Sequence, residues 1–120
     1  MAVFRPFKAL RPAEEYASRV AALPYDVMNS EEAREMVKGN PHSFLHVDKA
    51  EIDLEKGVDI YSDEVYAKAK ENLESLQKNG VMVQDEKNCF YIYRQIMDGR
   101  EQTGLVGCAS IDDYINNKIN

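Results

Sequence analysis

Residues 89–108 constrain the fold more than any other part of this chain, because they predict a β-hairpin. Two runs rich in β-branched and aromatic residues flank Asp98-Gly99. Asp-Gly is a preferred two-residue hairpin turn, since glycine accepts a positive φ without strain. Gly104 and Gly107, inside the second strand, indicate a bulge or a close approach by other backbone. The expected cross-strand pairs are Ile92–Leu105, Arg94–Thr103 and Cys89–Cys108.

Three helices are expected before the hairpin. The first begins at Pro12, a residue suited to a first helical turn, and Pro24 closes it. The second follows Asn29, which with Glu32 forms a capping box, and it ends at residues 39–41. Ser30 is a rival cap for this helix. The third and longest is capped by Ser62 and ends at residues 79–80, and a further helix begins at residues 111–115.

Extended segments are expected at residues 3–10, 43–48 and 81–84, and a long loop at residues 49–61. The segment 43–48 reads as a buried strand, in which alternation places His46 and Asp48 on one face. The predicted fold is α+β, with three helices packed on a small mixed sheet that includes the C-terminal hairpin. The chain of 120 residues suits a single domain, residues 1–120.

Composition narrows the classes of function. The net charge is −6 and the acidic residues are spread along the chain, which argues against a nucleic-acid partner and against an anionic membrane surface. No apolar run approaches the roughly 20 residues that cross a bilayer. The N-terminus lacks the apolar core of a signal peptide, so we expect a cytoplasmic protein with both cysteines as thiols. In that compartment a Cys89–Cys108 disulfide is not expected.

The sequence predicts no metal site and identifies no cofactor. Two cysteines with only His42 and His46 are too few for a zinc site. A glycine-rich phosphate loop and the CxxC and HExxH motifs are all absent from the sequence.

The strongest candidate site is the stretch from Tyr25 to Ser30, just before the second helix. Asp26 is the predicted catalytic residue, because a loop carboxylate there could act as a base or hold Mg²⁺. Tyr25, Asn29 and Ser30 are predicted ligand-binding residues beside it. The alternative is a structured turn in which Asp26 hydrogen-bonds its own backbone.

Two further residues are candidates for ligand binding. His46 could pair with Asp48 for acid–base work, or it could be a satisfied core histidine. Arg94, with Gln95 and Thr103, could contact an anionic ligand through its forked guanidinium, or these side chains could form a solvated sheet face.

Several motifs, in order along the chain, resemble domain-of-unknown-function family 1015. They are Phe4-Arg-Pro-Phe-Lys-Ala-Leu-Arg-Pro12, Leu23-Pro-Tyr-Asp-Val-Met28, Glu31-Glu-Ala-Arg34, Asn40-Pro-His-Ser-Phe-Leu-His-Val47, Tyr91-Ile-Tyr-Arg-Gln95 and Gln102-Thr-Gly-Leu-Val106. Members of this family are longer, so the resemblance implies the N-terminal portion of a longer protein. Their motif rich in His, Glu, Thr and Arg, which follows the hairpin, is missing here. The family has no established activity. More remotely, the chain is similar to the ParB/sulfiredoxin-like superfamily, which includes nucleotide-using free-serine kinases.

Two functions remain open at this stage. One is an enzyme that processes a small polar metabolite, or transfers phosphate to it from a nucleotide in the manner of a free-serine kinase. The other is a non-catalytic interaction or oligomerisation module. Its partner would be the remainder of the full-length chain or a second subunit.

Overall fold

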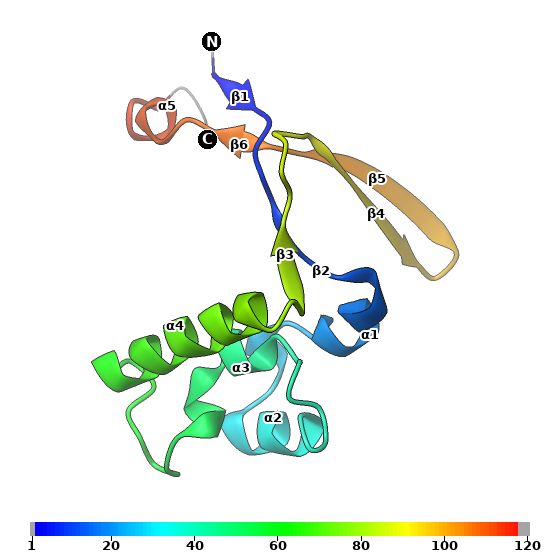
Figure 1. Ribbon diagram of the computed structural model, residues 1–120. Helices are drawn as coiled ribbons and strands as arrows, with labels where there is room; N and C mark the ends of the chain where they lie inside the picture. The colour runs from blue at the N-terminus through cyan, green and yellow to red at the C-terminus, as the bar shows by residue number, and fades with distance from the viewer. Residues whose placement is uncertain (1, 118–120) are drawn as a thin grey trace. The chain divides into compact units, whose positions relative to one another are not determined.

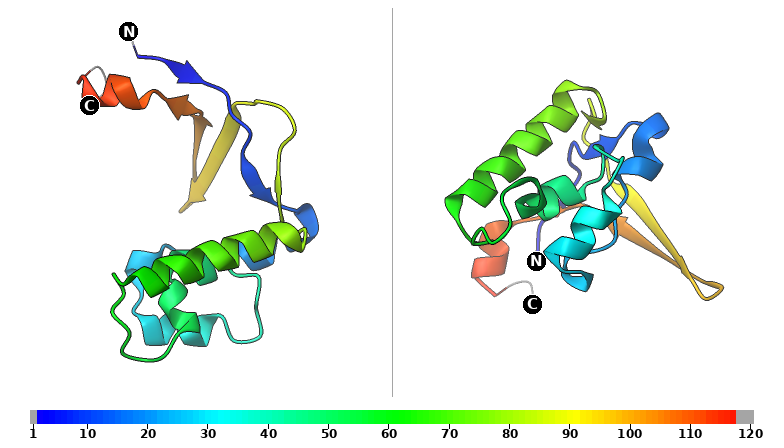
Figure 2. Two further views of the ribbon diagram at one scale, coloured as in Figure 1. Left: turned by 60° about the vertical axis from the view of Figure 1, so that its left-hand side comes forward. Right: turned by 90° about the horizontal axis from the view of Figure 1, so that it is seen from below.

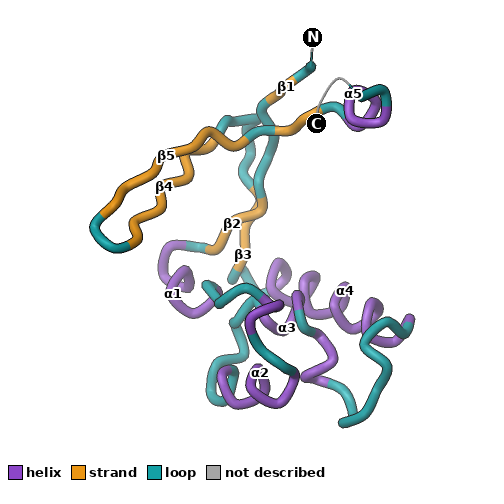
Figure 3. Tube along the Cα trace, turned by 180° about the vertical axis from the view of Figure 1, so that it is seen from behind, coloured by secondary structure: helices purple, strands orange, loops and turns teal. Residues whose placement is uncertain are grey.

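The computed structural model describes residues 2–117, which form two compact units. We call residues 11–83 the helical unit, and residues 2–10 together with 84–117 the hairpin unit. The division falls within two short strands, β2 (Leu10–Pro12) and β3 (Met82–Gln84), which pair with one another. Figure 3 shows that helices are concentrated in the helical unit and most strands in the other.

The hairpin unit is built on β4 (Tyr91–Met97) and β5 (Arg100–Val106), which pair antiparallel. Asp98 and Gly99 have φ values of 51° and 76°. These are the positive angles of the predicted turn, and the pairs Ile92–Leu105 and Arg94–Thr103 are confirmed. A second antiparallel pair joins β1 (Phe4–Arg5) to β6 (Cys108–Ala109), and α5 (Ile111–Ile115) follows.

Tyr91 ties the N-terminal segment to the start of the hairpin. Its hydroxyl donates to Asp85 and accepts a 2.9 Å hydrogen bond from the backbone N–H of Ala9. Desolvation, followed by the bond to Asp85, raises the pKa of Tyr91, so the phenol keeps its proton as a donor. At Gly107 a Cβ atom would lie 2.5 Å from the Phe4 ring, so the close neighbour is a side chain and not the predicted backbone.

The helical unit carries the rest of the helices, and Figure 1 shows α4 lying across the shorter ones. In chain order its elements are η1 (Glu14–Tyr16), α1 (Ala17–Val20), η2 (Tyr25–Val27), α2 (Ser30–Met36), α3 (Leu45–Asp48), η3 (Ala50–Asp53) and α4 (Asp63–Lys78). A core of Ala33, Leu45 and Ile52 joins α2, α3 and η3. α4 then packs against α3 and η3, as the view from below in Figure 2 shows.

The predicted strand at residues 43–48 is wrong, because this segment is a turn followed by α3. The Ser43 hydroxyl accepts a hydrogen bond from the backbone N–H of Leu45 at 3.3 Å, and this local bond favours a turn over an extended chain. A short apolar run does not reveal by its period whether it is a buried strand or a buried helical turn. The predicted loop at 49–61 likewise contains the short helix η3.

The α+β class is confirmed, but other details differ from the expectation. Among the described residues the strands form three two-stranded sheets, and not one mixed sheet. The first helix begins at Glu14 and ends at Val20, well before Pro24. The predicted Cys89–Cys108 pair is wrong, because the pairing of β4 with β5 ends at Tyr91 and Val106. Cys89 instead forms an antiparallel β-bridge with Phe7, and Cys108 pairs with Arg5.

The caps were predicted with mixed success. The Asn29 side chain accepts from the Glu32 N–H at 2.8 Å, which confirms the first half of the capping box. Ser62 precedes α4 as expected, yet its hydroxyl makes no cap bond and is buried without a partner among the described residues.

We predict that Gly99→Ala destabilises the chain by about 1–2 kcal/mol, because a Cβ atom is unfavourable at a φ of 76°. Gly104→Ala is the matched control. It has ordinary strand angles, and its new Cβ atom would lie 4.0 Å from the nearest atom, the Tyr93 carbonyl oxygen. The control should be neutral or slightly stabilising. Urea unfolding followed by far-ultraviolet circular dichroism compares the two, and equal effects would contradict the turn assignment.

Candidate functional site

The helical unit contains a hollow of about 560 Å³, open to solvent on one side. Four stretches of the chain supply its walls: the turn η2, the junction between α3 and η3, the residues just before α4, and one face of α4. We call it the α3–α4 hollow. Its polar lining consists of Tyr25, Asp26, Asp48, Lys49, Glu51, Tyr61 and Tyr66.

Tyr25 and Asp26 come to the hollow because they lie on η2, a single helical turn after Pro24. The backbone N–H of Val27 donates to the Pro24 carbonyl, which forms this turn. The Asp26 side chain makes no hydrogen bond or ion pair within residues 2–117, so it does not stabilise the turn as the alternative interpretation required. Its carboxylate is exposed beside the hollow.

Two charges in the hollow neutralise one another. Glu51 is only 5% exposed, and its carboxylate accepts from the Ser30 hydroxyl at 3.0 Å and lies 3.6 Å from the Lys49 ammonium. Arg34 donates to the backbone carbonyls of Glu51 and Ile52, at 3.1 and 3.3 Å, and so fixes this segment against α2. Burial of Glu51 is therefore compensated by a hydrogen bond and a cation.

Five other polar groups around the hollow have no partner. The carboxylates of Asp26 and Asp48 and the hydroxyls of Tyr25, Tyr61 and Tyr66 form no hydrogen bond or ion pair in the part of the chain that the structure describes. The three tyrosines are 57%, 76% and 58% exposed. Polar groups converging on a concave surface without internal partners are available to a ligand.

Asp48 is the perturbed acid of this site. Desolvation raises the pKa of its carboxyl above 3.8, the ordinary value for an aspartate. Asp48 remains exposed to solvent, and no cation pairs with its carboxylate among the described residues. Perturbed acids of this kind are concentrated at functional sites.

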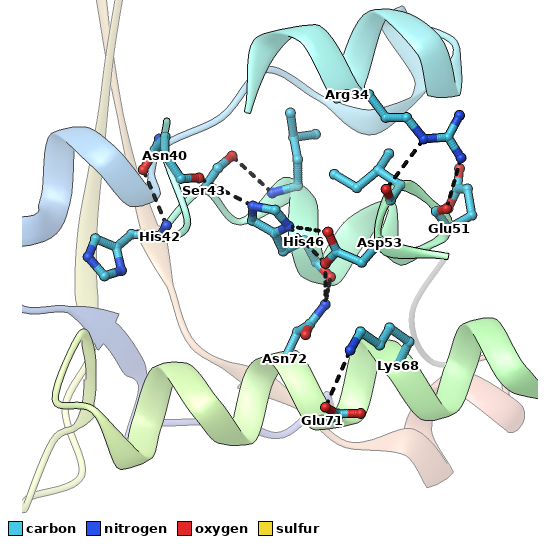
Figure 4. Close-up of polar contacts among 12 residues, drawn as sticks. Arg34, Asn40, His42, Ser43, His46, Glu51, Asp53, Lys68, Glu71 and Asn72 are labelled. Atoms are coloured by element: carbon cyan, nitrogen blue, oxygen red, sulfur yellow. Dashed lines mark hydrogen bonds and ion pairs between the residues drawn. The ribbon is translucent and has the colours of Figure 1, made fainter. Parts of the chain in front are cut away.

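His46 lies in a separate cluster and not in the hollow. Figure 4 shows its ring between Asp53, whose carboxylate is 2.9 Å from Nδ1, and the Asn40 carbonyl, 3.2 Å from Nε2. Asn72 of α4 donates to the His46 carbonyl and to Asp53, at 2.7 and 2.9 Å. The predicted pairing with Asp48 is wrong, because residues two apart on a helix point about 200° away from each other. This cluster joins α3, η3 and α4.

The remaining predicted residues have structural contacts. Asn29 caps α2, and Ser30 donates to Glu51 at the edge of the hollow. Arg94 belongs to the hairpin unit, where its guanidinium lies 2.7 Å from the Glu101 carboxylate on the opposite strand. The structure therefore places Tyr25 and Asp26 on the wall of the hollow, connects Ser30 to it only through Glu51, and places His46 elsewhere within the helical unit.

Sequence reasoning missed Lys49, Glu51 and Tyr61, because residues 49–61 read as a loop with no chemical motif. It also gave Tyr66 no part in the site. The only sequence signal was the acidic character of that loop beside the next helix. Within residues 2–117 no three His, Cys, Asp or Glu side chains are grouped closely enough to hold a metal ion.

Comparison with known protein families gives one match. The family model described as "Protein of unknown function (DUF1015)" matches residues 4–120, nearly the whole chain. The protein belongs to the DUF1015 family. Searches of curated proteins and of solved structures gave no significant match. In the part of this DUF1015 chain that the structure describes, no helix has both the length and the apolar character needed to cross a membrane.

We predict that Asp48→Asn stabilises this DUF1015 protein at pH 7, by roughly 0.5 kcal/mol or less because the site is solvent-accessible. The folded state has the higher pKa and so binds the proton more tightly than the unfolded chain. Stability therefore falls as the pH rises from 3.8 through the folded-state value, and the asparagine removes this loss. The advantage of the variant should vanish below pH 3.8.

Thermal unfolding between pH 3 and pH 8 measures this difference. Glu74→Gln is the control, since Glu74 is an exposed carboxylate on α4 that does not line the hollow. A pH-independent gain at Asp48, or an equal gain at Glu74, would count against desolvation as the cause.

Proposed function

We propose that the α3–α4 hollow binds a small metabolite that carries a hydroxyl group, and that a nucleotide phosphorylates this hydroxyl. Asp26 would accept the hydroxyl proton as the new bond from oxygen to the γ-phosphorus forms and the bond to the nucleoside diphosphate breaks. Phosphoryl transfer requires little beyond a positioned base and electrostatic stabilisation. The reaction class follows from the expectation, made from the sequence alone, of a remote resemblance to the superfamily that includes free-serine kinases.

One observation carries the proposal: Asp26 has an exposed, unpartnered carboxylate on the wall of a concave, polar site. A carboxylate engaged in a turn or a salt bridge would be directed at that partner and not at a substrate hydroxyl. Asp26 has no such contact within residues 2–117. Its neighbour Tyr25 supplies a free hydroxyl that could orient a substrate.

We propose that this reaction takes place in the cytoplasm, where Cys89 and Cys108, both exposed, would stay as thiols. The nucleotide would bring its own divalent cation. The three carboxylates of the hollow are balanced by one lysine and disfavour a bare polyphosphate, so the metabolite and not the nucleotide is assigned to the hollow.

We predict that Asp26→Asn in the full-length protein lowers kcat for phosphate transfer by about 10²–10⁴-fold, the usual contribution of a general base. Nucleotide affinity should change little, because the asparagine keeps the shape of the side chain. The measurement is ADP release with ATP and Mg²⁺ in the presence of a mixture of small hydroxyl compounds. Glu74→Gln should retain full activity, and an unchanged kcat in Asp26→Asn would remove Asp26 from the reaction.

A second proposed function, a non-catalytic interaction or oligomerisation module, rests on the hairpin. On one face of β4–β5 the cross-strand pair Ile92 and Leu105 is 77% and 62% exposed. Ile96, on the same face beyond the Arg94–Thr103 pair, is 64% exposed. Isolated two-stranded hairpins are only marginally stable, so a second subunit or the rest of the full-length chain would gain by covering this face. Light scattering tests whether a second subunit covers this face. A protein that stays monomeric at all concentrations would exclude a second subunit and leave the rest of the full-length chain as the partner.

A further inference from the structure

We infer that the ligand of the α3–α4 hollow is a small organic cation, with a primary or alkylated ammonium held by Asp48 among the tyrosine rings. This inference deepens the proposed function and depends on it only for the choice of the hollow. It concerns binding, and it can be tested without a nucleotide or any turnover.

The balance of charge favours a cation. The buried Glu51 is already bonded to Ser30 and lies beside Lys49, so these groups offer little net charge to a ligand. The carboxylates left over belong to Asp26 and Asp48, and neither has a partner among the described residues. A concave site whose free charges share one sign concentrates counter-ions, here cations.

The aromatic lining supports the same class of ligand. Tyr25, Tyr61 and Tyr66 come from three different segments, and each contributes a largely exposed ring to the same hollow. The face of an aromatic ring attracts ammonium groups, and rings combined with carboxylates are a usual means of recognising them.

The chemistry also excludes the opposite class. An anionic ligand would have to approach two free carboxylates, while the one lysine in the lining is 13% exposed and faces Glu51. A metal ion is a poorer occupant than an organic cation, since the described residues hold no group of three His, Cys, Asp or Glu ligands and ring faces supply no lone pair for coordination. Two carboxylates then have two roles, with Asp48 pairing the ammonium and Asp26 facing the hydroxyl.

Three probes of similar size test the inference by isothermal titration calorimetry on the full-length protein at pH 7. They are ethanolamine, ethylene glycol and glycolate, which combine one hydroxyl with an ammonium, a second hydroxyl and a carboxylate respectively. We expect millimolar binding of ethanolamine, and at least about tenfold weaker binding of the other two, the difference expected of a charge-assisted bond.

Variants identify the residues responsible. Asp48→Asn should weaken ethanolamine binding about tenfold, and it should not unfold the chain, because removal of this desolvated charge is stabilising. Tyr66→Phe, which keeps the ring, should bind nearly as well as the original, whereas Tyr66→Leu should lose about threefold. Glu74→Gln is the control and should bind ethanolamine unchanged.

Equal binding of ethanolamine and ethylene glycol, or tighter binding of glycolate, would overturn the inference, as would unchanged affinity in Asp48→Asn. These outcomes differ from a failure of the proposed function. If the hollow prefers a neutral hydroxyl compound and Asp26→Asn still abolishes turnover, the phosphotransfer proposal stands without the cation. If ethanolamine binds through Asp48 while Asp26→Asn turns over normally, the cation site stands and Asp26 is not the base.

Discussion

The helical unit depends on how residues 45–53 are held between α2 and α4. On one side, the Arg34 guanidinium donates to two successive backbone carbonyls of η3. On the other side, the Asn72 amide donates hydrogen bonds to the His46 backbone carbonyl and to the Asp53 carboxylate. Leu45 and Ile52 bury their side chains against Ala33 between these contacts. Side chains that are fixed from both sides give a short, irregular segment a defined shape.

That shape determines the chemistry of the hollow. Because α3 ends at Asp48 and η3 begins two residues later, the side chains of residues 48–51 are distributed around a tight bend and not along one strand face. Glu51 is turned inward and compensated, whereas Asp48 is partly desolvated and uncompensated. The difference between these two acids gives the site its negative character. A protein that leaves a charge unpaired in this way loses some stability, and active and binding sites commonly carry such a cost.

Local signals in the sequence predicted the elements that local interactions determine. The Asp98-Gly99 turn set the hairpin register, and Asn29 with Glu32 marked the start of α2, because each depends on a few adjacent residues. The run Phe44–Val47 was misread because its apolar pattern fits a buried strand as well as a buried helical turn, and tertiary packing decides between them. The same distinction between local signals and tertiary packing applies to the candidate site. Asp26 and Tyr25 were predicted from their position before a capped helix, whereas the placement of Lys49, Glu51, Tyr61 and Tyr66 around the same hollow depends on the packing of segments far apart in the chain.

The central claim is that the α3–α4 hollow is a binding site for a small cation bearing a hydroxyl. Nuclear Overhauser effects between unlabelled ethanolamine and the protein, labelled on its tyrosine rings, test it most directly. We predict effects from the ligand methylene protons to the rings of Tyr25, Tyr61 and Tyr66, and none to Tyr93 on the hairpin. Effects confined to tyrosines outside the hollow, or the same effects with ethylene glycol, would contradict the account.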